Sequence, residues 1–348
     1  MSRKPEGELR RGWTTGACAT AAVKAGLMQL WGGAFPDDVT ITLPRGEMPV
    51  FALAQSNAGD GWAEVGITKD AGDDPDVTHG ALIVVRVSAS AGGVVFAAGE
   101  GVGTITKAGL PIAVGEPAIN PVPREMMTAQ VVAMAAKFAQ KPDVTITVSV
   151  PGGLALAAKT WNPRLGIEGG LSILGTTGVV RPFSCAAWIA SIHRGIDVAR
   201  AEGLHHVAGC TGAQSEAAVQ ALHKLPDHAM LDMGDFAGGL LKYLAKHPVD
   251  QITIGGGIAK MTKLAQGASD LHSGRSQVNF EALADALSEK RIKTMNTALE
   301  VYETMGEPYA HWVAENALRS VNTLLKDAPV QADIVVTDRR GTILARVA

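Results

Sequence analysis

The sequence lacks most of the features that would place it in a membrane, among secreted disulfide-bonded proteins or on a nucleic acid. Its 348 residues include no apolar run that approaches the roughly 18 residues of a membrane span. Residues 1–12 lack the apolar core of a signal peptide. Three widely spaced cysteines without metal-ligand pairing predict reduced thiols and a cytoplasmic location. A formal net charge of −3 argues against a general nucleic-acid binder.

Aromatic residues are also few, whereas glycine is abundant. Forty glycines beside 5% aromatic residues predict many tight turns, as in α/β enzymes whose loops approach ligands. A hydrophobic share of 47% is ordinary for a globular protein, and the chain is longer than a single core usually supports. We therefore expect two domains.

The first part of the chain, residues 1–168, predicts an α+β domain. An alanine-rich stretch at 17–31 follows a threonine cap and predicts a helix, and a second helix is expected at 123–140. Short alternating or β-branched runs predict strands at 39–43, 49–55, 62–67, 81–88, 94–98 and 143–150. We expect these strands to pair largely antiparallel.

From Gly170 the pattern changes to a regular alternation of strands and helices, which favours a parallel sheet. Strands are expected at 171–174, 205–209, 229–232 and 250–254, and helices at 183–202, 213–224, 235–247 and 258–267. Residues 169–305 therefore predict a Rossmann-like domain. The fold class is α/β, with an α+β N-terminal domain and a Rossmann-like parallel-sheet domain.

The last part of the chain predicts further helices at 280–303 and 309–326 and a β-hairpin. The hairpin strands are expected at 333–337 and 342–347, on either side of a turn at 338–341. We treat residues 306–348 as a separate C-terminal segment, because the sequence does not show which domain the hairpin joins.

Each expected strand of the second domain ends in a loop of small or acidic residues. These loops are GTTG at 175–178, GCTG at 209–212, DMGD at 232–235 and GGG at 255–257. Because carboxyl ends of parallel strands share one edge of a sheet, we expect the four loops to converge on a ligand site. None matches a dinucleotide fingerprint or a phosphate loop, and the second strand ends in Gly209 and Cys210 without an acid. This counts against NAD and leaves another nucleoside open.

Residues 69–80, KDAGDDPDVTHG, form a dense acidic loop between two expected strands. A divalent cation is one interpretation, because hard cations bind carboxylate oxygens, although the loop lacks EF-hand spacing. In the other interpretation the carboxylates accept hydrogen bonds from nearby backbone N–H groups in a series of turns. The sequence favours the second interpretation and leaves contact with a ligand open.

Basic side chains accompany the glycine loops. They are Arg10, Arg11 and Lys24 near the turn at 14–16, and Arg164, Arg181, Lys260 and Lys263 around the later loops. Each by itself is typical of a solvated surface charge. As a group they suit a substrate with several carboxylates, because a guanidinium binds a carboxylate through two hydrogen bonds.

Nucleophilic catalysis finds little support in the sequence. Cys18 and Cys185 lie in expected helices and are interpreted as small buried hydrophobic residues, since no spacing supports a triad. Among the histidines, His272 is the best placed for chemistry because it follows the fourth glycine loop. A histidine at the surface or at a helix end is the competing interpretation.

Five segments that follow one another along the chain are long and unusual. They are GWTTGACAT at 12–20, KDAGDDPDVTHG at 69–80, NPRLGIEGGLSILGTTGVVRPFS at 162–184, DMGDF at 232–236 and GGGIAKMTKLAQG at 255–267. Together they resemble the cobalt-precorrin-5B C-1-methyltransferase family of cobalamin biosynthesis, the CbiD type. The resemblance departs at Trp13, where a tyrosine is expected, and at 151–156, where a stretch richer in glutamate is expected.

The resemblance implies transfer of a methyl group from S-adenosylmethionine to C-1 of a corrin precursor, giving (cobalt-)precorrin-6A, in a fold distinct from the usual tetrapyrrole methylases. Such a donor needs a nucleoside pocket and a place for an amino-acid carboxylate, which suits loops without a pyrophosphate fingerprint. Methyl transfer from a sulfonium can rely mainly on positioning, without an obligatory protein base. We expect no metal in the protein, because the cobalt belongs to the substrate.

By position, residues 175–178 match the central loop of the family and residues 14–16 its N-terminal turn. Donor contacts are expected at Gly175, Thr176, Thr177, Gly178, Gly209, Thr211, Asp232, Gly255 and Gly256, with Asp232 or Asp235 on a ribose hydroxyl or the ammonium. Substrate contacts are expected at Arg11, Thr14, Thr15, Arg164, Arg181, Lys260 and Lys263. If a base removes a proton from the macrocycle, the candidates are His272 and Asp235.

Two functions of other classes stay open. A nicotinamide-dependent reductase would use the Rossmann-like domain, and a non-catalytic tetrapyrrole carrier would use the basic side chains without a nucleoside pocket. The expected partner in every case is a small molecule, not a nucleic acid or a membrane. The sequence leaves open whether the substrate contains cobalt and whether the chain forms a homo-oligomer.

Overall fold

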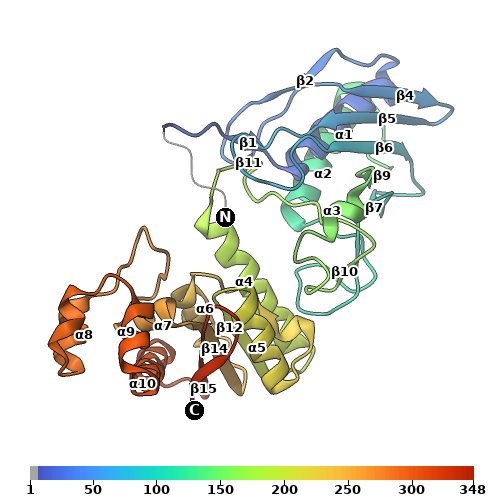
Figure 1. Ribbon diagram of the computed structural model, residues 1–348. Coiled ribbons are helices and arrows are strands. Elements are labelled where there is room, and N and C mark those ends of the chain that lie inside the picture. The colour runs from blue at the N-terminus through green and yellow to red at the C-terminus, as the bar shows by residue number, and fades with distance from the viewer. Residues whose placement is uncertain (1–6) are drawn as a thin grey trace. The chain divides into compact units, whose positions relative to one another are not determined.

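The chain divides into two compact units, Met1–Ser184 and Cys185–Ala348, in a computed structural model that describes residues 7–348 (Figure 1). The boundary thus lies after Ser184, whereas the sequence predicts it after residue 168. The reason is local pairing: β11 (Val179–Val180) forms a short antiparallel ladder with β1 (Gly12–Trp13) and so keeps residues 169–184 with the first unit. No helix in the described part of the chain is both long and apolar enough to cross a membrane.

The N-terminal unit is built on a five-stranded sheet in the order β4-β5-β6-β9-β7. Its strands are β4 (Gln55–Gly59), β5 (Trp62–Thr68), β6 (Leu82–Ala89), β7 (Val94–Ala98) and β9 (Val144–Ser149). Neighbouring strands are antiparallel except β7 and β9, which are parallel. The prediction of a largely antiparallel sheet is therefore confirmed, and β4 is a strand that the sequence pattern did not reveal.

Short two-stranded ladders surround this sheet. Besides β1 and β11, they join β2 (Asp38–Thr40) to β3 (Val50–Ala52), and β8 (Thr104–Ile105) to β10 (Ile167–Glu168). All three ladders are antiparallel. They fasten the long loops of the unit, which carry many of the expected site residues.

Helix α1 (Thr15–Gly32) lies at the centre of the N-terminal unit. It packs on β5 and β6 and against α2 (Pro121–Phe138), as Figure 1 shows. Its first half is buried almost all round, which its alanines allow because they let neighbouring backbones approach closely. The helix ends at Gly33, whose φ of 79° favours glycine. A one-turn helix, α3 (Gly153–Ala157), follows β9.

The C-terminal unit contains a mostly parallel sheet in the order β13-β12-β14-β15-β16. Its strands are β12 (His206–Cys210), β13 (Met230–Leu231), β14 (Gln251–Gly257), β15 (Gln331–Thr337) and β16 (Ile343–Val347). All neighbours are parallel except β15 and β16. If the five strands are numbered as they follow one another along the chain, their order in the sheet is 2-1-3-4-5. This is the doubly wound order of the flavodoxin type and differs from the Rossmann order.

The helices of this unit cover both faces of the sheet. They are α4 (Cys185–Ala201), α5 (Ala213–His223), α6 (Ala237–Leu244), α7 (Ile258–Ala265), α8 (Phe280–Ala286), α9 (Ala298–Met305) and α10 (Glu307–Leu325). The larger core joins one sheet face to all of these except α5. Helix α5 covers the other face, where Val219 packs on Ala208 and Val335. Two 3-10 turns, Asp227–Ala229 and Lys290–Thr294, connect elements.

Three expectations from the sequence need correction or completion here. Residues 171–174 are not the first strand of the parallel sheet: Leu171 and Ile173 form isolated bridges to Val102 and Ile119 inside the N-terminal unit. The helix expected at 280–303 is interrupted: α8 ends at Ala286, Ser288 has a left-handed backbone with a φ of 53°, and α9 begins only at Ala298. The C-terminal hairpin, which the sequence could not place, extends the parallel sheet of the second unit.

A polar cluster lies on the α5 face of this sheet, near the amino ends of the strands. Asp333, which is fully buried, lies 2.8 Å from His223 Nε2, 3.1 Å from Arg346 Nε and 3.1 Å from Thr253 Oγ1. The Thr253 hydroxyl also lies 2.8 Å from His206 Nε2. Burial, the neighbouring His223 and Arg346 together lower the pKa of His206 to about 4, although Asp333 opposes the shift.

This cluster predicts a pH-dependent stability of the C-terminal unit. Between the ordinary pKa of 6.5 and about 4 the unfolded chain binds a proton that folded His206 does not, so the folded unit loses stability as the pH falls through this range. We expect His206→Gln, which keeps a hydrogen-bonding group without titrating, to flatten the dependence of urea midpoints measured between pH 7.5 and 4.5. His205→Gln is the control, because exposed His205 pairs with Asp250 outside the cluster. Equal pH profiles for the two variants would contradict the assignment.

Candidate functional site

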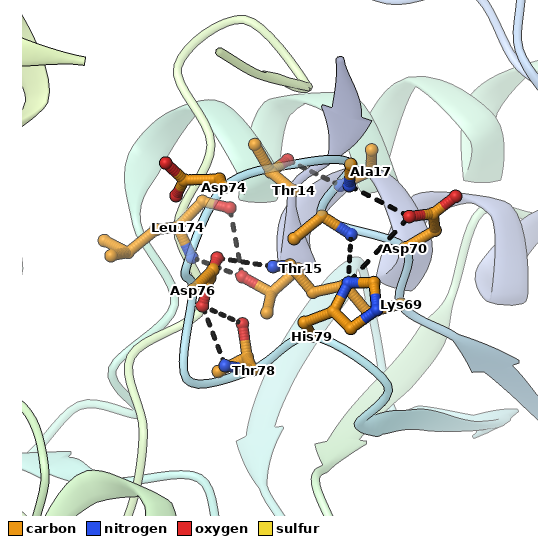
Figure 2. Close-up of polar contacts among 12 residues, drawn as sticks. Thr14, Thr15, Ala17, Lys69, Asp70, Asp74, Asp76, Thr78, His79 and Leu174 are labelled. Carbon is orange, nitrogen blue, oxygen red and sulfur yellow. Dashed lines mark hydrogen bonds and ion pairs between the residues drawn. The ribbon is translucent and has the colours of Figure 1, made fainter. Parts of the chain in front are cut away.

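The acidic loop of the N-terminal unit is organised around a buried ammonium group (Figure 2). The Lys69 side chain is 1% exposed, and its Nζ lies 2.5 Å from Asp76 Oδ2. Asp76 Oδ1 accepts hydrogen bonds from the backbone N–H and the hydroxyl of Thr78, at 2.8 and 2.6 Å. Burial alone would raise the pKa of Asp76, but Lys69 and these hydrogen bonds outweigh it, so the pKa lies below its usual value.

The other carboxylates of this loop also have partners within their own unit. Asp70 pairs with the Arg10 guanidinium, and this hydrogen-bonded pair lowers the pKa of Asp70 to about 2. Asp73 accepts the backbone N–H of Arg10 at 2.6 Å, and Asp74 accepts that of Phe183 at 2.8 Å. The loop thereby fastens residues 10–13 and the segment before the unit boundary. This arrangement supports the turn interpretation, and residues 7–348 contain no cluster of three or more potential metal ligands.

The expected turn at 14–16 and the loop at 175–178 lie against each other. The Thr15 hydroxyl bonds the carbonyl and the N–H of Leu174, at 3.2 and 3.0 Å (Figure 2). The Thr14 N–H donates to Gly178 O at 3.0 Å. A Cβ atom at Gly175 would come within 2.2 Å of Thr14 Oγ1, and one at Gly178 within 2.5 Å of Leu43. These two glycines are therefore explained by packing within the unit.

Two arginines remain available on the surface of this region. Arg11 precedes Gly12 and Arg181 follows Val180, and Gly12 and Val180 are the last paired residues at this end of the β1–β11 ladder. Both arginines are exposed. Within the described residues neither makes an ion pair. Thr176, in the adjoining loop, is exposed as well, and Thr177 bonds the backbone of Val179. Arg164 is half-buried in the turn before β10.

In the C-terminal unit the ends of β12, β14 and β15 meet at one edge, which we call the carboxyl edge and define by residues 209–212, 255–257 and 337–339. Three of the four predicted loops belong to this unit, whereas residues 175–178 belong to the other. The third is the loop after β13: buried Asp235 lies 2.8 Å from Lys260 Nζ, which also donates to Thr211 O at 2.9 Å. Lys260 thus ties these loops together.

Several residues expected to bind ligands instead hold the carboxyl edge in shape. Lys263 is 7% exposed and donates to Leu271 O at 3.0 Å, and burial lowers its pKa despite nearby Asp235. The carbonyl of half-buried Asp232 accepts Trp188 Nε1–H at 2.8 Å. Lys260 and Lys263 thus have partners inside the unit, and the substrate contacts expected of them stay a prediction.

The glycines at this edge are of two kinds. Cβ atoms at Gly209, Gly255 and Gly256 would come within 2.6 to 2.8 Å of neighbouring side chains, so these glycines are required for packing. Gly212 and Gly257, the last glycines of their loops, face open space instead. They line a cavity of about 220 Å³ together with Thr211, Ala213, Gln214, Ser215, Thr337, Asp338 and Arg339. The sequence predicts Thr211 at this site but not Thr337, Asp338 and Arg339, because the sequence pattern does not place the C-terminal hairpin.

His272 lies in a tight turn. The ring Nδ1 of His272 accepts a hydrogen bond from the backbone N–H of Gly274 at 3.1 Å. The backbone N–H of His272 donates to Asp270 Oδ1, also at 3.1 Å. An Nδ1 that accepts a hydrogen bond is unprotonated, so the neutral ring carries its proton on Nε2 and presents a donor there.

The cysteines match the sequence prediction only in part. Cys18 is fully buried in α1, and burial raises the pKa of its thiol to about 12, which makes it a poor nucleophile. Cys185 is exposed at the start of α4, so its interpretation as a buried hydrophobic residue is wrong. Helix α4 turns its apolar side, with Ile192 and Ile196, toward the core and leaves its first turn outside. Cys210 is buried at the end of β12.

Comparison with known proteins gives one family for both ends of the chain. Residues 2–182 match the model of the CbiD family, and residues 270–348 match that of the CbiD C-terminal domain. A curated relative from Brucella canis, named cobalt-precorrin-5B C(1)-methyltransferase, is 59% identical over 99% of this chain and 98% of its own length. One of the same name from Brucella anthropi is 60% identical over 98% and 96%.

A solved structure is similar as well. It is the 1.9 Å crystal structure of the cobalamin biosynthesis protein cbiD from Archaeoglobus fulgidus, which is 28% identical. The match covers 78% of this chain and 84% of that chain, with a TM-score of 0.43.

The buried Lys69–Asp76 pair generates a stability prediction. Asp76→Ala leaves an uncompensated buried ammonium and should reduce the free energy of unfolding by about 3 kcal/mol. Lys69→Met combined with Asp76→Leu should cost less than Asp76→Ala, because no charge is left unpaired. Urea denaturation of the purified variants measures both. Because the pKa of Asp76 is lowered on folding, its contribution should persist above its ordinary pKa of 3.8 and disappear as the pH falls further.

Glu64→Ala is the control for this experiment, because its cationic partner Arg86 is 48% exposed, whereas Lys69 is buried. It should change the free energy of unfolding by less than about 1 kcal/mol. A cost of Asp76→Ala no larger than that of the control would show that the Lys69 charge is solvated.

Proposed function

The chain belongs to the CbiD family, and from that premise we propose that it methylates C-1 of cobalt-precorrin-5B, with S-adenosylmethionine as the methyl donor. The identity over nearly the whole chain to relatives of that name is the observation that carries the proposal. The protein is a C-methyltransferase of cobalamin biosynthesis. A nicotinamide-dependent reductase and a non-catalytic carrier gain no support from these relatives.

We assign the donor to the carboxyl edge of the C-terminal unit. Ligands of doubly wound sheets bind beyond the carboxyl ends of the strands, where the strand order reverses, and here this point lies between β12 and β14. The residues present fit the donor: Gly212 and Gly257 leave backbone exposed to the cavity, and the buried hydroxyl of Thr337 has no hydrogen-bond partner among the described residues. The sulfonium of the donor supplies the methyl group.

We assign the carboxylates of the substrate to the N-terminal unit. Arg11 and Arg181 flank the β1–β11 ladder with guanidinium groups that have no ion-pair partner among residues 7–348, and Thr176 offers a hydroxyl in the neighbouring loop. A guanidinium binds a carboxylate through two parallel hydrogen bonds, so such a pair can hold two acidic arms of a macrocycle. Thr14 and Thr15 support this surface, because the Thr14 backbone N–H donates to Gly178 O and the Thr15 hydroxyl bonds the backbone of Leu174.

Catalysis in this proposal comes mainly from positioning. Holding two reacting atoms in a productive geometry can contribute about 7–11 kcal/mol, which a methyl transfer can use without a protein base. Asp235 and His272 stay the candidate bases, but both have internal partners: Asp235 pairs with Lys260, and His272 Nδ1 accepts a backbone N–H. We place the reaction in the cytoplasm, a reducing compartment that suits three free cysteines.

Calorimetric titration with S-adenosylhomocysteine and, separately, with NAD tests the donor. We expect the first to bind and the second not to bind, since no acid follows β12 to hold a ribose diol. Transfer of a labelled methyl group to cobalt-precorrin-5B, detected by mass spectrometry, then tests the reaction. Binding of NAD alone would favour the reductase, and a bound corrin without methylation would favour the carrier.

The arginine pair predicts a selective effect on substrate affinity. Arg11→Gln combined with Arg181→Gln should raise KM for the corrin substrate by at least about tenfold, because charged hydrogen bonds are lost. The Kd for S-adenosylhomocysteine should stay within twofold, roughly the limit of surface effects. Arg45→Gln is the matched control, because Arg45 is exposed in the turn between β2 and β3. An unchanged KM would remove the pair from the substrate site.

His272→Gln tests the need for a base. We expect kcat to fall by less than about threefold, since general-base catalysis typically contributes 10²-fold or more and positioning does not require it. A pH profile of kcat between 6 and 9 accompanies the measurement. A loss of about 10²-fold together with the disappearance of an acid limb would establish His272 as the base.

A further inference from the structure

The cavity at the carboxyl edge is too small for a whole cofactor. Its volume is about 220 Å³, whereas pockets for complete drug-sized ligands run roughly from 300 to 1,000 Å³. Its lining comes from residues 211–212 after β12, from the first turn of α5, from Gly257 at the end of β14, and from Thr337 at the end of β15 with the two residues that follow it. It therefore suits one polar end of a larger ligand that extends along the edge.

The N-terminus of α5 presents backbone donors to this cavity. Gly212 precedes the helix and supplies no side-chain cap, and in the described chain the N–H groups of Ala213 and Gln214 have no hydrogen-bond partner. The Ser215 hydroxyl donates to Gly212 O at 2.8 Å and leaves those groups free. Free N–H groups and the positive end of the helix dipole favour an anion.

Thr337 is a second and independent sign of a ligand. It is 1% exposed, lines the cavity, and its Oγ1 has no partner among the described residues, although buried hydroxyls almost always have one. Side chains alternate along a strand, so Thr337 points to the same face as Val335, which packs on α5, and Asp333, which bonds His223 of α5. The unsatisfied hydroxyl thus lies on the side of the helix N-terminus.

Charges of both signs lie at the mouth of the cavity. Arg339 is exposed and makes no ion pair among residues 7–348. Its neighbour Asp338 carries a carboxylate whose Oδ1 accepts the N–H groups of Arg340 and Thr342, each at 2.8 Å. Arg339 beside the free N–H groups of α5 can bind a carboxylate of a ligand. The Asp338 carboxylate next to them can bind an ammonium group of the same ligand. A phosphate would use only the first half of this arrangement.

We propose that this cavity binds the α-amino-acid end of the methyl donor, with its carboxylate on the α5 N-terminus, Thr337 and Arg339, and its ammonium near Asp338. The inference rests on the proposed function, because it takes S-adenosylmethionine as the donor. It names the residues that distinguish the complete donor from a nucleoside without the amino-acid group.

The N-terminus of α1 shows that this feature is not common to every helix of the protein. Its first turn is satisfied by its own unit: Gly16 N–H donates to Leu174 O at 2.8 Å, and Ala17 N–H to Thr14 Oγ1 at 3.1 Å. An anion there would have to displace these bonds. The α5 N-terminus requires no such displacement.

The test compares two ligands on one protein by calorimetry: S-adenosylhomocysteine, and 5′-methylthioadenosine, which lacks the amino-acid group. Wild type should bind the first more tightly. Thr337→Val keeps the shape of the side chain. It should raise the Kd for S-adenosylhomocysteine by about tenfold, because a hydrogen bond to a charged group is lost, and should leave the Kd for methylthioadenosine within twofold. Thr337→Ser should restore most of the affinity, and thermal unfolding checks that each variant is folded.

Arg339→Gln should show the same selectivity, with Arg340→Gln as the matched control from the same turn. If both ligands bind and neither variant changes their affinity ratio, the inference is overturned while the proposed donor stands. If wild type binds neither ligand, the proposed donor falls and the inference falls with it. The outcomes therefore separate failure of the site from failure of the function.

Discussion

Close packing against glycines is the constraint on which both units depend. A Cβ atom at Gly12 would lie 2.1 Å from the carbonyl carbon of Ala71, so strand β1 can reach the acidic loop only as glycine. In the other unit, a Cβ at Gly256 would lie 2.8 Å from both Thr211 Oγ1 and Met261 Sδ. The ladder that closes the N-terminal unit and the junction of β12 with β14 both require this closeness. The high glycine content is therefore in large part a packing requirement.

That constraint separates structural glycines from those able to meet a ligand. The glycine run Gly255–Gly257 contains both kinds: two residues are enclosed by their own unit, and the last opens onto the cavity. The same contrast appears in the helix N-termini. The first turn of α1 is satisfied by Thr14 and Leu174, whereas among the described residues that of α5 has free N–H donors beside an unsatisfied hydroxyl. The two helix N-termini therefore differ in whether their hydrogen-bond donors have partners, and the sequence pattern does not show this difference.

Charge is divided between the units in a way that suits the proposed reaction. In the N-terminal unit the carboxylates of the acidic loop pair with Lys69, Arg10 and backbone N–H groups. Exposed Arg11 and Arg181 have no ion-pair partner within the described part of the chain. In the C-terminal unit Lys260 and Lys263 are used to hold loops together. We therefore attribute binding of a polycarboxylate to the first unit and binding of the donor to the second.

Local pattern predicted much of the fold but little of the exact site. The helices α1, α2, α4 and α5 and the strand β7 fall where propensity and periodicity place them, because each is specified by adjacent residues. Leu171–Leu174 has the composition of a buried strand, yet composition does not name its partner, and it bridges residues of the first unit. The break at Ser288 was equally invisible, since the residues on both sides favour a helix.

The sequence by itself determined the family, the α/β class and which loops are rich in glycine, since these depend on residue identity and short-range order. Tertiary structure alone decided that residues 175–178 and the carboxyl edge belong to different units, and that a C-terminal hairpin completes the edge. It also decided that Thr337 rather than Gly255 faces the cavity. The physical reason is that pairing between distant strands and the satisfaction of each buried polar group are properties of the packed chain, which no single segment carries.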